Sequence, residues 1–286
     1  MALARTDLRD PLLAPYQDAL LTSERLSALP WLRHGITGRI PDIEPADANI
    51  GYSAPRDREA AWVERQRWCL AARIDPLAMS TVHQVHGRDV VAVSLAESGR
   101  GGPLGSTSLG QADALMTDVP GVAVMTLHAD CLPIILVEPE VKAICVIHAG
   151  WRGTVADIPG AAVRAMSERY GANPARVIAL LGPGIRSCCY EVGDEVIDAW
   201  RDLAGAGANA SIARGALKWH LDLPSANRIL LRRAGIREDQ IDDQASCTRC
   251  NGDRWFSHRG QGAETGRFAA MAGIAPERNG ESDPWY

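Results

Sequence analysis

ADALMTD (residues 112–118), GVAVMTLHADCLPIILVEP (121–139) and VKAICVIHAGWRGT (141–154) decide the fold of this chain. Each run is dense in Val, Ile, Leu and Ala, a composition typical of buried β-strands. The last two runs are separated by only a few turn residues, so we expect neighbouring strands to pair as hairpins. The centre of the chain therefore predicts a β-sheet with antiparallel pairing.

Helical and strand-like segments alternate on both sides of this centre. Apolar residues at helical spacing fill residues 57–74, and Pro76 ends that pattern. The other expected helices cover residues 155–170, 193–203 and 224–234, and the other expected strands cover 31–40, 81–94, 177–185, 217–221, 241–247, 255–259 and 266–274. This order favours an α+β fold, with mixed β-sheets and flanking helices, over a regular parallel doubly wound fold.

No repeat, low-complexity tract or linker divides the chain. A single domain over residues 1–286 is expected, with residues 1–30 as a less regular N-terminal extension. The chain has 30 Lys and Arg against 35 Asp and Glu, a net charge of −5, which argues against nucleic-acid binding through bulk charge. No apolar run is long enough to span a membrane, and the N-terminus lacks a secretory signal.

The odd count of 7 cysteines suggests reduced thiols and a cytoplasmic protein, with a monomer as the default. Cys247 and Cys250 form a CxxC, but no second CxxC completes a zinc site. Cys188 and Cys189 are adjacent, which makes them poor partners for one tetrahedral ion. We therefore expect these four cysteines to be structural.

Three segments each present a metal-binding side chain at the end of a predicted strand: His86 in QVHG, Cys131 in ADCLPI and His148 in HAGWRGT. Each residue alone is more often a packed core residue than a ligand. Together, two imidazoles and a thiolate would bind zinc and leave a fourth position for water or substrate. The same residues also allow a metal-free site in which a histidine activates Cys131 as a nucleophile. The residues alone do not decide between these two interpretations.

Other polar residues near these segments suggest supporting roles. The glycines on both sides of Trp151-Arg152 let the backbone approach a ligand, and the Arg152 guanidinium suits a phosphate or carboxylate. We expect His83 and His128 to be hydrogen-bond partners of the ligands or surface residues. The alternative for His128 is a fourth ligand, which would close the metal site and argue against catalysis.

The motifs QVHG, ADCLPI, HAGWRGT, LGPGIRSCCYEVGDEV, CTRCNGDRWFSHR and TGR, in this order, resemble the YfiH-like laccase-domain family. The resemblance begins at about residue 48. It implies one laccase-type domain with the fold shared by YfiH and the cytotoxic necrotizing factors. It also implies that His86, Cys131 and His148 are the metal ligands and border the reacting substrate. The implied metal is zinc, with copper as the alternative.

The family's names imply different activities. One implies phosphorolysis of adenosine, inosine and methylthioadenosine, together with deamination of adenosine to inosine; the partners are then purine nucleosides and phosphate. For this reaction we infer, independently of the family motifs, that Arg152 or Arg259 holds the phosphate. A second name implies a Cys/His amidase that edits peptidoglycan precursors through Cys131 and His148. A third implies a copper polyphenol oxidase, which is disfavoured because the 7 histidines include no H-x-H pair.

Overall fold

Two β-sheets stacked face to face form the centre of the molecule. The computed structural model describes residues 11–44, 46–53, 55–215, 217–244, 246–276 and 285. The large sheet has six strands in the order β12 (Ile241–Asp243), β8 (Ile178–Leu181), β6 (Leu132–Glu138), β7 (Ala143–Ala149), β4 (Ala114–Thr117) and β3 (Val90–Ala92). The second sheet has four, in the order β1 (Leu32–Ile36), β13 (Phe268–Ile274), β5 (Ala123–His128) and β2 (Met79–Ser80).

The large sheet is built around the hairpin of β6 and β7, as the sequence predicts. β4 and β8 pair antiparallel on either side, and the edge strands β3 and β12 pair parallel. Ile135 and Val146 face the second sheet, whereas their neighbours Ile134 and Ile147 face the helices. Both faces are therefore buried, which explains why the sequence of these strands is apolar almost without interruption.

The second sheet joins distant parts of the chain. β13 lies between β1 and β5 and is antiparallel to both, while β2 is parallel to β5. Val124 of β5 and Ala270 of β13 face the large sheet and belong to the core between the sheets.

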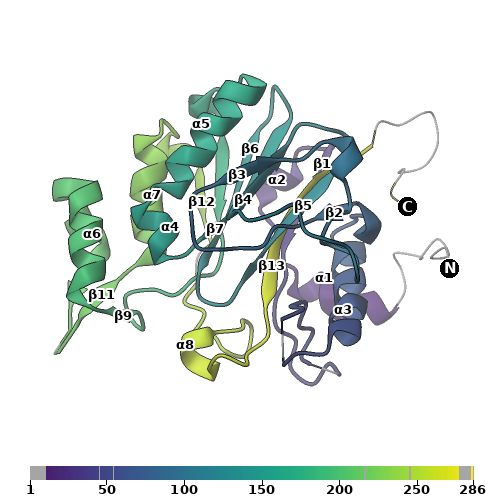
Figure 1. The fold of residues 1–286 in the computed structure, drawn as a ribbon, viewed down its shortest axis with the longest axis horizontal. Coiled ribbons are helices and arrows are strands. Elements are labelled where there is room, and N and C mark those ends of the chain that lie inside the picture. The colour runs from purple at the N-terminus through teal and green to yellow at the C-terminus, as the bar shows by residue number, and fades with distance from the viewer. Residues whose placement is uncertain are drawn as a thin grey trace.

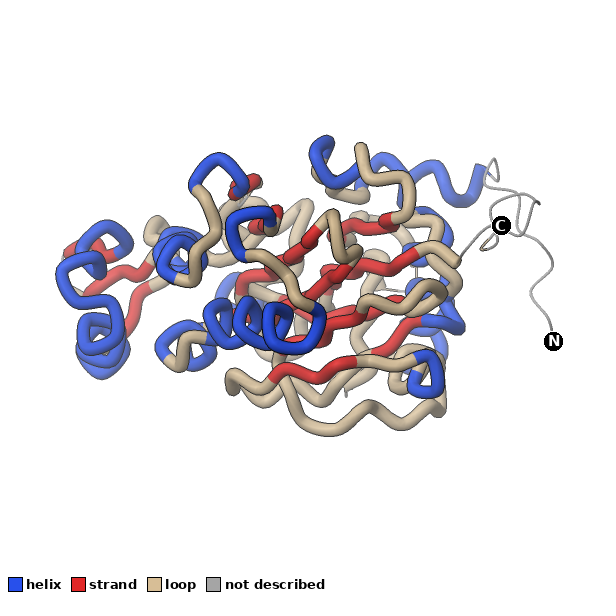
Figure 2. The backbone as a smooth tube through the Cα atoms, turned by 90° about the horizontal axis from the view of Figure 1, so that it is seen from above, coloured by secondary structure: helices blue, strands red, loops and turns tan. Residues whose placement is uncertain are grey.

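Helices cover the outer faces of both sheets (Figure 1). The α-helices of the described part of the chain are α1 (Ala14–Ala19), α2 (Glu24–Ser27), α3 (Arg58–Ala71), α4 (Trp151–Val155), α5 (Ile158–Tyr170), α6 (Asp194–Ala204), α7 (Leu223–Arg233) and α8 (His258–Gln261). α5 and α7 cover the large sheet, and α1 and α3 pack on the second sheet. A small sheet of β10 (Ile212–Arg214), β11 (Trp219–Leu221) and β9 (Glu191–Val192) lies beside α6, away from α1 and α3 (Figure 2).

The predicted α+β class with mixed sheets and flanking helices is confirmed. Part of the predicted N-terminal extension is integral to the fold, because Tyr16 of α1 and Leu26 of α2 are buried. Residues 1–10 lie outside the described part. Within that part, no helix combines the length and apolar character that a bilayer crossing requires.

Three strand predictions are wrong in detail. The run 121–139 contains two strands that do not pair, because residues 129–131 carry the chain from the second sheet to the large one. Residues 81–89 form a loop instead of a strand, since His86 has a φ of 61°, which a β-strand does not accommodate. Residues 255–259 leave a turn and enter α8, where the Ser257 hydroxyl accepts the backbone amide of Gly260.

Candidate active site

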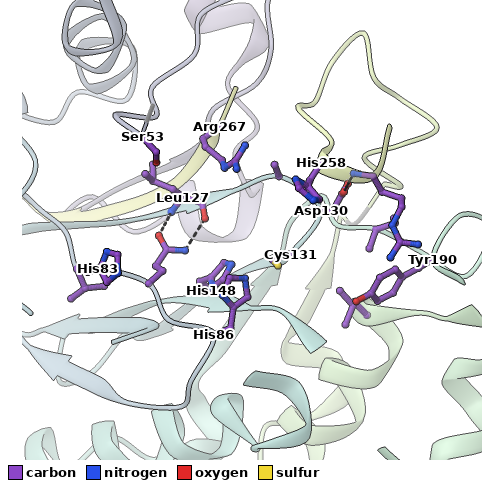
Figure 3. A pocket seen from close by; sticks show the side chains of 16 residues that line it. Ser53, His83, His86, Leu127, Asp130, Cys131, His148, Tyr190, His258 and Arg267 are labelled. Carbon is purple, nitrogen blue, oxygen red and sulfur yellow. Dashed lines mark hydrogen bonds between the residues drawn. The ribbon is translucent and has the colours of Figure 1, made fainter. Parts of the chain in front are cut away.

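His86, Cys131 and His148 meet where strands of the two sheets end. Cys131 is the last residue of the crossing from β5 to β6, His148 lies near the end of β7, and His86 lies in the loop before β3. Their ligand atoms all lie within 4.8 Å of one another, and Figure 3 shows the three side chains together. The structure thus brings together the three residues that the sequence analysis selected.

Asp113, the residue just before β4, holds two of these side chains in place. Its carboxylate accepts a hydrogen bond of 2.8 Å from Nδ1 of His148, which leaves Nε2 to face Cys131. It also accepts the amide N–H groups of Val85, His86 and Gly87, which stabilises the left-handed conformation of His86. Asp113 is not marked by any sequence pattern, because a single acidic residue before a strand carries no motif of its own.

The electrostatics favour a charged pair at Cys131 and His148. Burial alone would raise the pKa of Cys131, but the charge of His148 and hydrogen bonds from His148 and His86 outweigh burial and lower it to about 6. Burial alone would lower the pKa of His148, but the Cys131 thiolate and Asp113 raise it to about 9. Without a metal, the site therefore holds a thiolate beside an imidazolium at neutral pH. The thiolate is both the nucleophilic and the metal-binding form of cysteine.

His128 hydrogen-bonds to the backbone of Cys131 and is not part of the candidate ligand group. Its Nδ1 donates to the carbonyl of Cys131 at 3.1 Å, and its Nε2 accepts the hydroxyl of Thr126 at 2.8 Å. Burial lowers its pKa well below 6.5, so the ring is neutral. Because both ring nitrogens have protein partners, His128 is a hydrogen-bond partner and not the fourth ligand. His83 is exposed on the cavity wall and outside the ligand group.

The three side chains form part of the wall of a cavity of about 570 Å³, a size typical of small-molecule sites. The cavity is lined by Ser53, Val82, His83, Gln84, His86, Leu127, Ala129, Asp130, Cys131, His148, Ile185, Tyr190, Leu223, His258, Arg259 and Arg267. Apolar groups, among them Leu127 of β5, and polar groups from several loops thus surround one space. Figure 3 shows Arg267 and Tyr190 on different parts of this wall.

The arginines on the cavity wall are only partly those that the sequence suggested as phosphate ligands. Arg259 lines the cavity, lies 5.2 Å above the Tyr190 ring and donates to the carbonyl of Glu191. Arg152 is exposed, stacks on the Trp151 ring and lies outside the lining. Arg267 of the TGR motif is a wall residue that the sequence analysis did not select, and burial lowers its pKa.

Asp130 connects the loop that carries Cys131 to the loop that carries Arg259. Its carboxylate accepts the hydroxyls of Thr248 and Ser257 and the backbone amide of Arg259 at 2.6 Å. Asp130 adopts a φ of 86°, an uncommon backbone conformation for a residue with a side chain. The position next to Cys131 was the only sequence signal for this role.

The backbone next to His148 leaves no room for a further side chain. A Cβ at Gly150 would lie 2.9 Å from Sγ of Cys131 and 3.0 Å from Cδ2 of His86. Glycine therefore allows the three candidate ligands to converge. Two imidazoles and one thiolate, with an open side toward the cavity, are a donor set suited to a metal ion with three protein ligands.

Comparison with known proteins agrees with this architecture. The family model for multi-copper polyphenol oxidoreductase laccase matches residues 33–275, so the chain belongs to this YfiH-like laccase-domain family. The hypothetical protein YfiH of Bacillus licheniformis has a crystal structure that superposes with a TM-score of 0.84 at 29% identity, covering 91% of this chain and 97% of that one.

Curated relatives of this chain have enzyme names, and two of them are described here. Purine nucleoside phosphorylase YlmD of Geobacillus stearothermophilus is 35% identical over 240 residues, which cover 81% of this chain and 85% of the relative. Adenosine deaminase RL5, from an unknown prokaryotic organism, is 41% identical over 157 residues, which cover 54% of this chain and 59% of the relative. The resemblance inferred from the sequence motifs is confirmed.

Proposed function

We propose that this chain is a zinc-dependent purine nucleoside enzyme. It cleaves adenosine, inosine and methylthioadenosine with phosphate, giving the base and a ribose 1-phosphate or its methylthio form, and it also deaminates adenosine to inosine. The observation that carries the proposal is the convergence of His86, Cys131 and His148 on a cavity of small-molecule size. The names of the relatives, a purine nucleoside phosphorylase and an adenosine deaminase, supply the substrate class.

In this proposal His86, Cys131 and His148 hold the zinc ion. Asp113 fixes the tautomer of His148 by accepting its Nδ1–H, as acidic partners of metal-bound histidines commonly do. When bound, the zinc supplies Lewis acidity and activates water near neutral pH. The donor set of nitrogen and sulfur, held within 4.8 Å, supports zinc over harder cations such as Mg²⁺.

The rest of the wall binds and orients the substrate. Arg259 and Arg267 supply positive charge for a phosphate, and their positions on the cavity wall favour them over Arg152. The partial burial of Arg267 strengthens its attraction for an anion, since solvent screens it less. The amide of Gln84 is fixed by two hydrogen bonds to the backbone of Leu127, so this part of the wall is rigid. Phosphorolysis then depends on positioning phosphate against the anomeric carbon.

One specific arrangement supports a second candidate, the Cys/His amidase. Cys131, His148 and Asp113 are linked by hydrogen bonds in the order nucleophile, base and orienting carboxylate. The low pKa of Cys131 makes it a thiolate without any metal. A cell-wall precursor amide would be its substrate. The copper oxidase stays the least favoured, because only His86 and His148 of the described histidines belong to a candidate metal group.

The test is to incubate metal-quantified protein with adenosine, with and without phosphate, and to separate the products by chromatography. The proposal predicts inosine in both samples, and adenine with ribose 1-phosphate only when phosphate is present. Adenosine that stays intact in the presence of stoichiometric zinc would overturn the substrate assignment. The same preparation would then be assayed with peptidoglycan precursors to test the amidase.

The proposal also covers the location, oligomeric state and domain organisation of the protein. None of the 7 cysteines is in a disulfide, which supports a reducing cytoplasmic location. We propose a monomer with one laccase-type domain over residues 1–286. The pairing of β1 with β13 supports the single domain, because it joins the two ends of the described chain in one sheet.

A further inference from the structure

Four cysteines outside the candidate active site have their sulfur atoms in one cluster. Sγ of Cys250 lies 3.5 Å from Sγ of Cys188 and 3.4 Å from Sγ of Cys189. Cys247 completes the group, and all four sulfurs lie within 4.8 Å of one another. Their adjacency in the sequence predicts that Cys188 and Cys189 are poor partners for one ion, but the turn that they occupy brings both sulfurs to Cys250.

The spacing of these sulfurs matches a tetrahedral metal site. A disulfide requires an S–S distance of about 2.05 Å, much shorter than the separations in the cluster. Zinc–sulfur bonds of about 2.3 Å place the corners of a tetrahedron about 3.8 Å apart. We propose that Cys188, Cys189, Cys247 and Cys250 bind one structural zinc ion through four thiolates.

The surroundings of the cluster suit thiolate ligands. The backbone amides of Arg186 and Cys250 donate hydrogen bonds to the sulfur of Cys247, which stabilises negative charge there. Cys247 is buried, while Cys188 and Cys250 are exposed and give an ion access from solvent. Four crowded sulfurs repel one another when deprotonated, so a divalent cation is the natural counter-charge.

The cluster joins two loops that both supply residues to the active-site cavity. Tyr190 directly follows Cys189, and Thr248, between Cys247 and Cys250, donates its hydroxyl to Asp130. The second loop leads on to Arg259, which lies over the Tyr190 ring. The ion would thus fix one wall of the cavity without touching the substrate. This role is independent of the reaction assigned to the first site.

The test measures zinc per chain in full-length variants purified under reducing conditions. Cys131→Ala removes a ligand of the candidate active site, so any zinc that remains reports the cysteine cluster. We expect about one zinc per chain in Cys131→Ala and none in Cys131→Ala/Cys250→Ser. The exposed Arg249 lies in the same turn, and Cys131→Ala/Arg249→Ala is the matched control that keeps its zinc. Wild type is expected to hold about two.

A second measurement uses the wild-type protein, so the proposal can be tested even if a variant fails to fold. Wild-type protein reconstituted with cobalt should show the intense thiolate-to-cobalt absorption of a tetrahedral four-sulfur site, and Cys131→Ala should retain this absorption. The proposal is overturned if folded Cys131→Ala holds no zinc, or if mass spectrometry finds the four cysteines as disulfides. Wild type with zinc only in the cluster would leave this proposal intact and contradict the zinc enzyme instead.

Discussion

Asp113 is the residue on which the geometry of the candidate site depends most. One carboxylate orients the ring of His148 and also binds the amides that hold the loop of His86. Two candidate ligands that lie far apart in the sequence are therefore held in place by one carboxylate. A change at Asp113 should affect metal binding although the residue is not itself a ligand.

Asp113→Asn is expected to weaken zinc binding by about 10–100-fold, because a neutral amide no longer stabilises the Nδ1–H of His148. Competition with a zinc chelator of known affinity measures the change. Asp118→Asn, at an exposed acid five residues further on, is the control and should bind zinc as wild type does. Equal affinity in both variants would mean that the hydrogen bond to His148 has no role in holding the metal.

Gly150 gives a second prediction at this scale. Alanine readily adopts the φ of −79° at this position, so the substitution tests only whether there is room for a methyl group. Gly150→Ala should push Cys131 and His86 apart and lower turnover by an order of magnitude or more, since a misplacement of about 1 Å can cost on the order of 100-fold. Gly207→Ala meets only one atom, at 3.9 Å, and serves as the matched control. Full activity of Gly150→Ala would show that the site tolerates a wider ligand spacing.

The sequence pointed to the three candidate ligands more clearly than to the residues that position them. His86, Cys131 and His148 were identifiable because imidazole and thiolate are rare, and because each stands at a strand end next to small residues. Asp113 and Arg267 are common residue types whose roles arise only from folding. The four-cysteine cluster was missed for a similar reason, since nothing in the sequence places the Cys188 turn beside Cys247 and Cys250.

At the scale of elements, the contact between β1 and α2 contains a buried histidine. Ser23, the residue before α2, donates its backbone N–H to Nε2 of His34 in β1 at 3.0 Å. Burial lowers the pKa of His34 to about 4, below its ordinary value of 6.5. Between these two pH values the unfolded state binds more protons than the folded state, so stability falls as the pH falls.

His34→Gln should remove this contribution, because the glutamine amide oxygen can accept the Ser23 N–H but does not titrate. Between pH 6.5 and pH 4, wild type should lose up to about 3 kcal/mol more unfolding free energy than the variant. Urea unfolding of both proteins at several pH values measures the difference. Parallel pH curves would indicate that His34 is protonated within the folded protein.

Some helices and strands could be predicted from sequence patterns and others could not. Period and composition identified α3 and the β6–β7 hairpin, because both have strong local signals. They did not reveal that β5 and β6 belong to different sheets, since the apolar pattern of a strand does not depend on which sheet it joins. Residues 81–89 have an alternating pattern, but the amides of Val85, His86 and Gly87 bond to the Asp113 carboxylate instead of to a neighbouring strand.

At the scale of the whole molecule, the core between the two sheets should make the fold cooperative. Ile135 is fully buried there, and Ile135→Ala should lower the free energy of unfolding by about 2–5 kcal/mol. Trp68, Trp200 and Trp255 are buried in different clusters of the core and report on each through fluorescence. Unfolding by fluorescence and by far-UV circular dichroism should coincide in both proteins. Two separate transitions would contradict the proposed single domain.

The central claim is that zinc held by His86, Cys131 and His148 is required for the nucleoside reaction. Cys131→Ala tests it most directly, with zinc in the active site, product formation from adenosine and circular dichroism measured on one preparation. We predict that the variant keeps its fold, because an ion with three ligands need not support folding, and that it loses both this zinc and activity. A folded variant that keeps its active-site zinc and full turnover would contradict the account.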